Sequence, residues 1–364
     1  MRCGRRVRSL KHFAWVILLL PASVAAGDRF PVPALPWSPL RYVCARAPQA
    51  PTIDGRLDDP AWREAAWTDP FVDIEGAVRP DPRFLTRARM LWDERYFYVA
   101  AEMEEPHVWG TLTERDAVIF RDNDFEVFLD PDGDTHEYYE LEINALGTEW
   151  DLLLVRPYRD GGPAVNAWDI QGLQTAVFID GTINQPGDTD RGWSVEIAFP
   201  WSVLGQCAHR PAPPERGDQW RVNFSRVEWD VDIRRGAYVK VVDEATGEPH
   251  PEHNWVWSPQ GLINMHYPEM WGFVQFSDRA DAPWIERARP QVAWQLRRAY
   301  YRQRQHQRDH GRYAGDLEAL GLRAPAGWSY DWPPRIEVAG EQFNASLALP
   351  CGGRLHIGQD GRIW

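Results

Sequence analysis

Carboxylates are dense in the first three quarters of the sequence, and some stand at spacings that could do chemistry. Glu140 and Glu142 alternate along a run with strand-like periodicity, so both side chains should lie on one face of the strand. Two carboxyl groups about 5–10 Å apart can cleave a glycosidic bond, and Asp151 is a third acid nearby. The same pattern is also typical of the solvent-facing side of a half-buried strand, which is the simpler interpretation.

A second acidic group, Asp130, Asp132 and Asp134, alternates in a loop after a strand-like run. Hard oxygen ligands at this density suit Ca²⁺, so the loop is a candidate structural calcium site. It is not an EF-hand, because Gly133 comes too early and Leu141 occupies the place of the closing Glu. A solvated turn between two strands is the alternative interpretation.

Tryptophan is unusually frequent, at 20 of 364 residues. Its flat apolar ring suits either a core or a site that stacks on another ring. Trp92, Trp193 and Trp220 fall in strand patterns and are expected in the core. Six others fall in or beside loop-like segments, where either role is open: Trp109, Trp150, Trp168, Trp229, Trp255 and Trp257.

The elements that must position these side chains are mostly strands. Period-two alternation, punctuated by Gly, Pro, Asn and Asp, predicts many short strands without intervening helices, which is typical of an antiparallel β-sandwich. The expected strands cover residues 87–92, 96–103, 125–129, 139–144, 193–197, 220–224 and 271–276. No G-x-S-x-G, Walker or G-x-G-x-x-G motif is present.

The pattern changes after Pro283. Residues 285–310 have helical periodicity, residues 316–320 predict a second short helix, and residues 335–338, 343–349 and 354–357 predict small strands. The last 82 residues carry 12 Arg and 8 acidic residues, whereas the whole chain has a net charge of −13. We therefore expect a sandwich at 45–278 and a small α+β C-terminal extension at 283–364, with a Pro-rich segment at 27–44.

Residues 1–26 have the layout of a secretory signal peptide, with a basic start, a short apolar run from Phe13 to Leu20 and small residues for cleavage. We expect an exported protein, periplasmic or extracellular, without a membrane span. Export permits disulfides, and Cys44–Cys207 is the favoured pair, with Cys351 left over. The acidic chain is a poor candidate for binding nucleic acid.

Five phrases in order resemble carbohydrate-binding modules of family 9, and together they cover about residues 45–278. They begin with Ile53-Asp54-Gly55 and Asp58 to Trp62, continue with Met90 to Ala100, Asp122 to Asp130 and Gly192 to Trp201, and close with Trp271 to Phe276. The resemblance implies a DOMON-like β-sandwich with structural calcium and a sugar held between aromatic faces. It is closest to the family-9-like exported bacterial proteins.

Carried onto this sequence, the resemblance implies that Trp257 is a stacking ring and that Glu126, Asn144 and Asn254 contact sugar. Phe120 stands where the second stacking Trp is expected, and Glu142 stands where an Arg is expected. Trp255 joins this set as a neighbour of the Asn-x-x-Trp motif. Replacing Arg with Glu removes a fork of donors to sugar hydroxyls and changes the specificity that the resemblance implies.

The sequence thus predicts a non-catalytic carbohydrate-binding module that serves polysaccharide breakdown beside separate glycoside hydrolases. One alternative is a glycoside hydrolase that uses Glu140, Glu142 or Asp151. Another is a haem-binding module of the DOMON-like type, with axial ligands drawn from Met103, His107, Met265 and His266.

Overall fold

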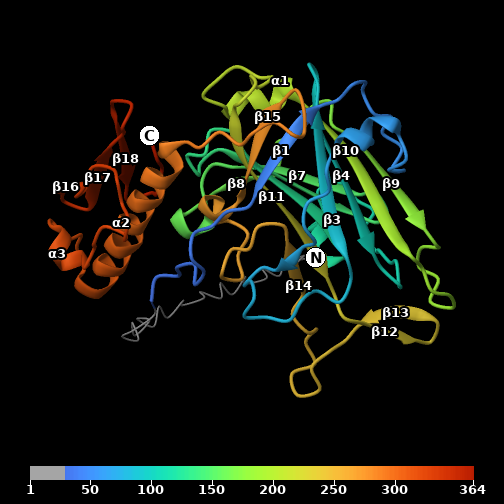
Figure 1. The fold of residues 1–364 in the computed structure, drawn as a ribbon. Coiled ribbons are helices and arrows are strands. Elements are labelled where there is room, and N and C mark those ends of the chain that lie inside the picture. The colour runs from blue at the N-terminus through green and yellow to red at the C-terminus, as the bar shows by residue number, and fades with distance from the viewer. Residues whose placement is uncertain (1–28) are drawn as a thin grey trace, which may run out of the picture.

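The fold is a β-sandwich with a smaller C-terminal unit beside it, as the computed structural model of the chain shows (Figure 1). The structure describes residues 29–364, so the predicted signal peptide lies outside the described residues. Within residues 29–364, no helix is long and apolar enough to cross a membrane.

One continuous sheet forms the sandwich by curling over on itself, in the order β8-β7-β6-β5-β11-β15-β1-β3-β4-β10-β9. The first half contains β8 (Ala164–Val165), β7 (Glu149–Leu154), β6 (Tyr138–Asn144), β5 (Asp124–Asp130), β11 (Gln219–Glu228) and β15 (Gly272–Ser277). The second half contains β1 (Arg41–Arg46), β3 (Thr86–Trp92), β4 (Tyr96–Glu104), β10 (Gly192–Pro200) and β9 (Gln174–Asp180). Two further strands, β14 (His253–Val256) and β2 (Val72–Asp73), extend the sheet from β11.

Smaller elements complete the chain. They are the hairpin of β12 (Val231–Arg234) and β13 (Ala237–Lys240), the short helices α1 (Trp201–Leu204) and α3 (Leu317–Leu320), the long helix α2 (Ala288–His310), and the three-stranded sheet of β16 (Arg335–Ala339), β17 (Gln342–Ala348) and β18 (Arg354–Gly358). The strands and helices predicted from periodicity are all present, and most begin or end within one to three residues of the predicted positions.

Strand β1 joins the two halves, because it pairs with β15 on one side and β3 on the other, both in parallel. The sequence predicts an irregular Pro-rich segment at residues 27–44 and a sandwich that begins at residue 45. The structure begins the sandwich at Arg41 instead. The prolines flank the strand and do not enter it, so its backbone N–H groups remain free to pair.

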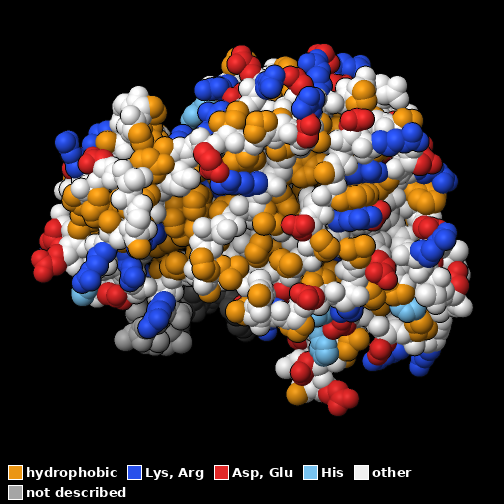
Figure 2. Space-filling view, in the orientation of Figure 1, with side chains coloured by type: hydrophobic (Ala, Val, Ile, Leu, Met, Phe, Trp, Pro, Cys, Tyr) orange, Lys and Arg blue, Asp and Glu red, His pale blue; other side chains and the backbone are white. Residues whose placement is uncertain are grey.

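The main core lies between the two halves of the sheet. Alternate residues of each strand point inward, such as Val127 on β5 and Phe224 on β11, and they meet Val99 on β4 and Val195 on β10. The opposite faces of β5, β6 and β7 are therefore free to carry other side chains. On the molecular face shown in Figure 2, acidic and basic side chains are interspersed and do not separate into patches of one sign.

The predicted Cys44–Cys207 disulfide is wrong, because both thiols are free, as is Cys351. Cys44 is fully buried among apolar core side chains on β1. Cys207 lies just beyond α1, where its backbone N–H donates to the hydroxyl of Tyr139 at 3.0 Å.

The C-terminal unit, residues 283–364, has its own apolar core between α2 and the sheet of β17 and β18. Tyr267 and Met270, from the loop before β15, belong to the same cluster, so the unit is docked on the sandwich. Buried ions reinforce the contact: Arg159, after β7, lies 2.9 Å from Glu269, and Glu269 also accepts a hydrogen bond from Tyr301 of α2.

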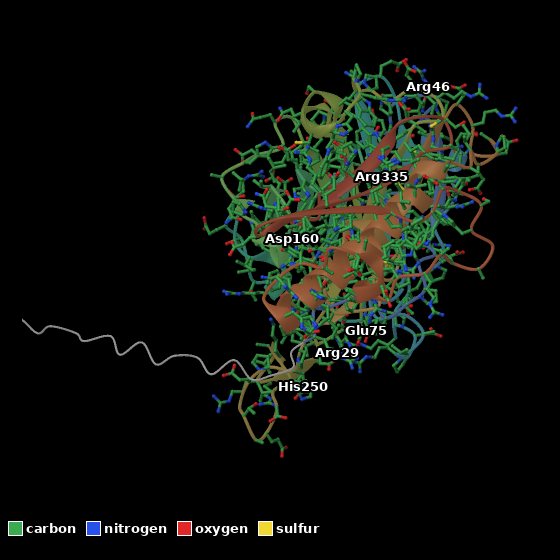
Figure 3. All side chains as sticks on the ribbon, turned by 90° about the vertical axis from the view of Figure 1, so that its left-hand side faces the viewer. Arg29, Arg46, Glu75, Asp160, His250 and Arg335 are labelled. Atoms are coloured by element: carbon green, nitrogen blue, oxygen red, sulfur yellow. The ribbon has the colours of Figure 1, made fainter. Side chains whose placement is uncertain are left out.

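The loop between β7 and β8 is held in the same way. Asp160, labelled in Figure 3, accepts hydrogen bonds from Tyr300 and Arg304 of α2. The side chains of Asp160, Arg159 and Glu269 are almost fully buried. The docking of the C-terminal unit therefore fixes both the loop after β7 and the turn before β15.

We predict that Glu269→Gln destabilises the protein by about 3–5 kcal/mol, because it leaves Arg297 buried without an acidic partner among the described residues and leaves Arg159 with Asp160 alone. Chemical denaturation measures the change. Glu286→Gln is the matched control, since the ion pair between Glu286 and Arg41 is exposed and is worth little. Equal stability of the Glu269→Gln variant and the wild type would contradict the role given to this pair.

The same pair predicts a pH dependence. Burial opposes ionisation of Glu269, but Arg159 and Arg297 outweigh it and lower the pKa of Glu269 from 4.5 to about 2. Its contribution to stability is present above pH 4.5 and is lost as the pH falls from about 4.5 to about 2. The free energy of unfolding should therefore fall less steeply over this range in Glu269→Gln than in the wild type, and parallel curves would contradict the assignment.

Candidate functional site

A row of side chains crosses five strands on the face of the first half that points away from the main core. The pairing register places Val256 of β14, Ser225 of β11, Glu126 of β5, Glu142 of β6 and Trp150 of β7 side by side. Glu126 and Glu142 are directly opposite each other. Like charges in that position repel, so the sequence places here a pair that strand stability alone would not favour.

Glu126, Glu142 and Trp150 of this row form the floor of a cavity of about 310 Å³. Its walls come from the segment before β5, the loop after β7 and the loop between β14 and β15. The lining residues are Ile74, Phe120, Glu126, Phe128, Glu140, Glu142, Trp150, Tyr158, Val227, Glu252, Asn254, Ile263, Asn264, Met265 and His266.

Aromatic rings form one side of the cavity. The rings of Phe120 and Trp150 lie 6.4 Å apart between centroids and are tilted by 32°. Tyr158 adds a third ring from the loop that the C-terminal unit holds, and it is half exposed. The indole N–H of Trp150 has no hydrogen-bond partner among the described residues. The wall thus offers apolar ring faces and an unused donor.

The cavity is also lined by the carboxylates of Glu126, Glu140, Glu142 and Glu252. The described lining residues include no Lys or Arg. Burial raises the pKa of Glu126 to about 7. Burial, then the charge of Glu126, raises the pKa of Glu140 and Glu142. His266 is neutral at pH 7, since burial and Arg159 lower its pKa to about 3. The cavity therefore presents acceptor oxygens without a balancing positive side chain.

Four of the seven predicted ligand-contacting residues meet in this cavity: Phe120, Glu126, Glu142 and Asn254. The backbone N–H of Phe120 donates to the Glu142 carboxylate at 2.9 Å, which fixes the ring and the acid relative to each other. Whether these residues contact a ligand stays a prediction.

Trp257 does not present a stacking face, which corrects the prediction. Its side chain is only 2% exposed and belongs to the main core, where it packs against Phe224 and Tyr42. A Cβ on Gly272 would come within 2.5 Å of the indole ring, so Trp257 also fills the space left by that glycine.

Asn144 and Trp255, also predicted to contact a ligand, are instead buried in contacts within the protein. The Asn144 side chain is fully buried at the end of β6, where it donates to the carbonyl of Leu112 and accepts from the N–H groups of Leu146 and Thr148. Trp255 is buried beneath the guanidinium of Arg226 and lines a neighbouring cavity instead. Neither side chain lines the cavity described above.

We predict that Trp257→Ala destabilises the protein by about 3–5 kcal/mol through the loss of core packing. The change should appear in chemical denaturation without any ligand. A variant with wild-type stability would return Trp257 to the set of candidate ligand-contacting residues.

The Asp130–Asp134 loop uses its carboxylates within the protein. Asp130 accepts from the N–H groups of Gly133 and Thr135, and Asp132 lies 2.9 Å from His209. Asp134 pairs with Arg362 at 2.7 Å. The donor set fits calcium poorly, because Arg362 already supplies a positive charge and each of these carboxylates already has partners. Calcium in this loop stays a prediction that the geometry does not favour.

The residues of the hydrolase and haem alternatives come together only in part, since Glu140 and Glu142 both line the cavity. Asp151 lies on the face of β7 opposite Trp150 and is bonded to Arg115. Met103 points into the main core and His107 contacts Tyr238. Met265 and His266 do line the cavity, but among carboxylates.

Three lining residues, Tyr158, Glu140 and Glu252, were absent from the predicted ligand set, and Trp150 was only one of six open tryptophans. The register of β6 and β7 identifies Trp150, because it stands opposite Glu142. This pairing can be recognised only if β7 is known, and periodicity in the sequence does not predict a strand there. Tyr158 and Glu252 come from irregular loops and carry no periodic signal.

The family model described as "Carbohydrate family 9 binding domain-like" matches residues 53–246, about half of the chain. The sandwich and the match define the class as that of carbohydrate family 9 binding domains. The chain belongs to this family.

Two curated relatives are similar in sequence over part of the chain. Exoglucanase XynX of Acetivibrio thermocellus is 27% identical over 157 residues, which are 42% of this chain and 12% of the relative. Endo-1,4-beta-xylanase C of Paenibacillus barcinonensis is 30% identical over 90 residues, which are 25% of this chain and 8% of the relative. The chain thus spans about a tenth of the length of these relatives.

Two solved structures are similar at low identity. A family 9 carbohydrate-binding module from Caldicellulosiruptor kristjanssonii, in complex with cellotriose, is 17% identical with a TM-score of 0.44 and covers 68% of this chain and 98% of its own. A putative carbohydrate-binding protein from Bacteroides uniformis is 17% identical with a TM-score of 0.47 and covers 66% and 100%.

Proposed function

We propose that this protein binds a poly- or oligosaccharide in the cavity on β5, β6 and β7, without cleaving it. The observation that carries the proposal is the pairing of ring faces with acceptor oxygens in one cavity, together with membership of the family. Sugar rings have apolar C–H faces that pack on aromatic rings, and hydroxyl rims that donate to carboxylates and amides.

In this proposal the aromatic and the polar side chains contact different parts of the sugar. Trp150, Phe120 and Tyr158 take the sugar face. Glu126 and Asn254 take hydroxyls, with Trp150 also offering its free indole N–H. Hydrogen bonds from hydroxyls to buried carboxylates are stronger than those between neutral groups.

The charge of the cavity narrows the ligand class. No Lys or Arg is present among the described lining residues, so a uronic acid or sulfated glycan would lose water around its charge without gaining a positive partner. We therefore expect neutral glycans to bind in preference to acidic ones.

The proposed setting is outside the cytoplasm. The signal-peptide pattern of residues 1–26 supports export to the periplasm or the extracellular space. The names of the two relatives, an exoglucanase and a xylanase, support a role beside glycoside hydrolases in polysaccharide breakdown.

Isothermal titration calorimetry with neutral cello-, xylo- and manno-oligosaccharides tests the proposal. We predict that Trp150→Ala weakens binding at least about tenfold, a loss of ~1.4 kcal/mol that is typical of one aromatic contact.

Trp364→Ala is the matched control, because Trp364 is a half-exposed tryptophan of the C-terminal unit that lies outside the cavity. It should leave the affinity unchanged. Absence of heat with every glycan, or equal losses in both variants, would contradict the proposal. Release of reducing sugar by the wild type would favour the hydrolase alternative.

A further inference from the structure

Three buried carboxylates cluster on β5 and β6, and two of them line the cavity. Asp124 and Glu126 are two residues apart on β5 and share a face, and Glu142 stands opposite Glu126 on β6. One carboxylate oxygen from each lies within 4.8 Å of the other two. The residues are 0%, 4% and 1% exposed, respectively, so the cluster is buried.

The backbone orients two of these acids and leaves one oxygen without a partner. Asp124 accepts the N–H of Val227 through Oδ1, at 3.3 Å, while its Oδ2 has no hydrogen-bond partner among the described residues. Glu142 accepts the N–H of Phe120 through Oε2. A buried oxygen without a partner is costly unless something binds it.

The cluster also lacks charge compensation among the described residues, unlike several other buried acids. Glu269 is paired with Arg159, and Glu228 and Glu105 are both paired with Arg226 at 2.9 Å. None of Asp124, Glu126 and Glu142 forms a salt bridge with any described residue. Instead, burial and the neighbouring carboxylates raise the pKa of Asp124 and Glu142.

We infer that Asp124, Glu126 and Glu142 bind one divalent cation of the oxygen-preferring kind, such as Ca²⁺. Ligand oxygens 2.3–2.6 Å from such an ion lie up to about 5 Å apart, which agrees with the spacing of the cluster. Glu126 and Glu142 line the cavity, which provides an entry path and room for water or sugar hydroxyls to complete the coordination. The site does not require that sugar binds.

Terbium luminescence tests this inference, because Tb³⁺ replaces Ca²⁺ in oxygen sites and Trp150, opposite Glu142, can sensitise it. Wild-type protein without sugar should give sensitised emission that Ca²⁺ displaces. Asp124→Asn should weaken Tb³⁺ binding at least tenfold and abolish the rise in melting temperature that Ca²⁺ gives to the wild type.

Asp132→Asn is the matched control, since it changes a separate cluster, that of Asp132, Asp134 and His209, and should leave cavity binding intact. Asp124→Asn should fold, because it removes a buried charge and keeps the shape; its melting temperature in EDTA checks this, and Glu142→Gln serves as a second variant. Folded wild type without sensitised emission, or emission lost in Asp132→Asn and kept in Asp124→Asn, would overturn the inference.

Oligosaccharide titration in the presence and absence of EDTA separates this inference from the proposed function. Equal sugar binding in both, with no Ca²⁺ effect on stability, would overturn the cation site and leave sugar binding standing. Binding of a glucosamine oligomer that Asp124→Asn abolishes, in a wild type that gives no sensitised Tb³⁺ emission, would assign the acids to an organic ammonium group and also overturn it.

Discussion

The pairing register of β7, β6, β5 and β11 is the constraint on which the rest of the structure depends. In this register, one face of each strand fills the main core, while the other presents Glu126, Glu142 and Trp150 in a line. A slip of one residue would turn those acids into the core and the core side chains outward. The stability gained from packing the apolar core therefore offsets the repulsion between the acids in this row.

The chain buries charge in two contrasting ways. Where the C-terminal unit meets the sandwich, Glu269 and Asp160 are surrounded by guanidinium and phenol groups, so their charge is balanced within the protein. At the cavity, Glu126 and Glu142 have no guanidinium partner among the described residues. The paired acids hold the C-terminal unit on the sandwich, whereas the carboxylates without a positive partner remain available to bind a ligand.

The sequence was informative where periodicity is strong. Strand β6, with clean alternation, and the small C-terminal sheet were predicted to within one residue at each end, whereas β10 ends three residues later than predicted and α2 begins three residues later. β1 was missed because prolines flank it, and its pairing partners are distant in sequence. The half-exposed β9 was missed as well, because an edge strand carries a weaker apolar pattern.

The residues of the cavity were predictable only in part, because some of them are positioned by contacts between segments that are distant in the sequence. The family resemblance led to Phe120, Glu126, Glu142 and Asn254, and the last three lie on the strands β5, β6 and β14. The motif could not show that Trp257 lies under Gly272, because that contact depends on how β15 packs. Residues from irregular loops, such as Tyr158, are positioned by tertiary contacts alone.

The cavity wall has a consequence for ligand choice. Asn254 and the residues from Ile263 to His266 lie beyond the family match, which ends at residue 246, and the docked C-terminal unit holds the end of that segment in place through Glu269. Under the proposed function, a substitution there would change the cavity wall while every strand pair in the floor stays as it is. The part of the wall that distinguishes one ligand from another would therefore lie outside the residues that define the family.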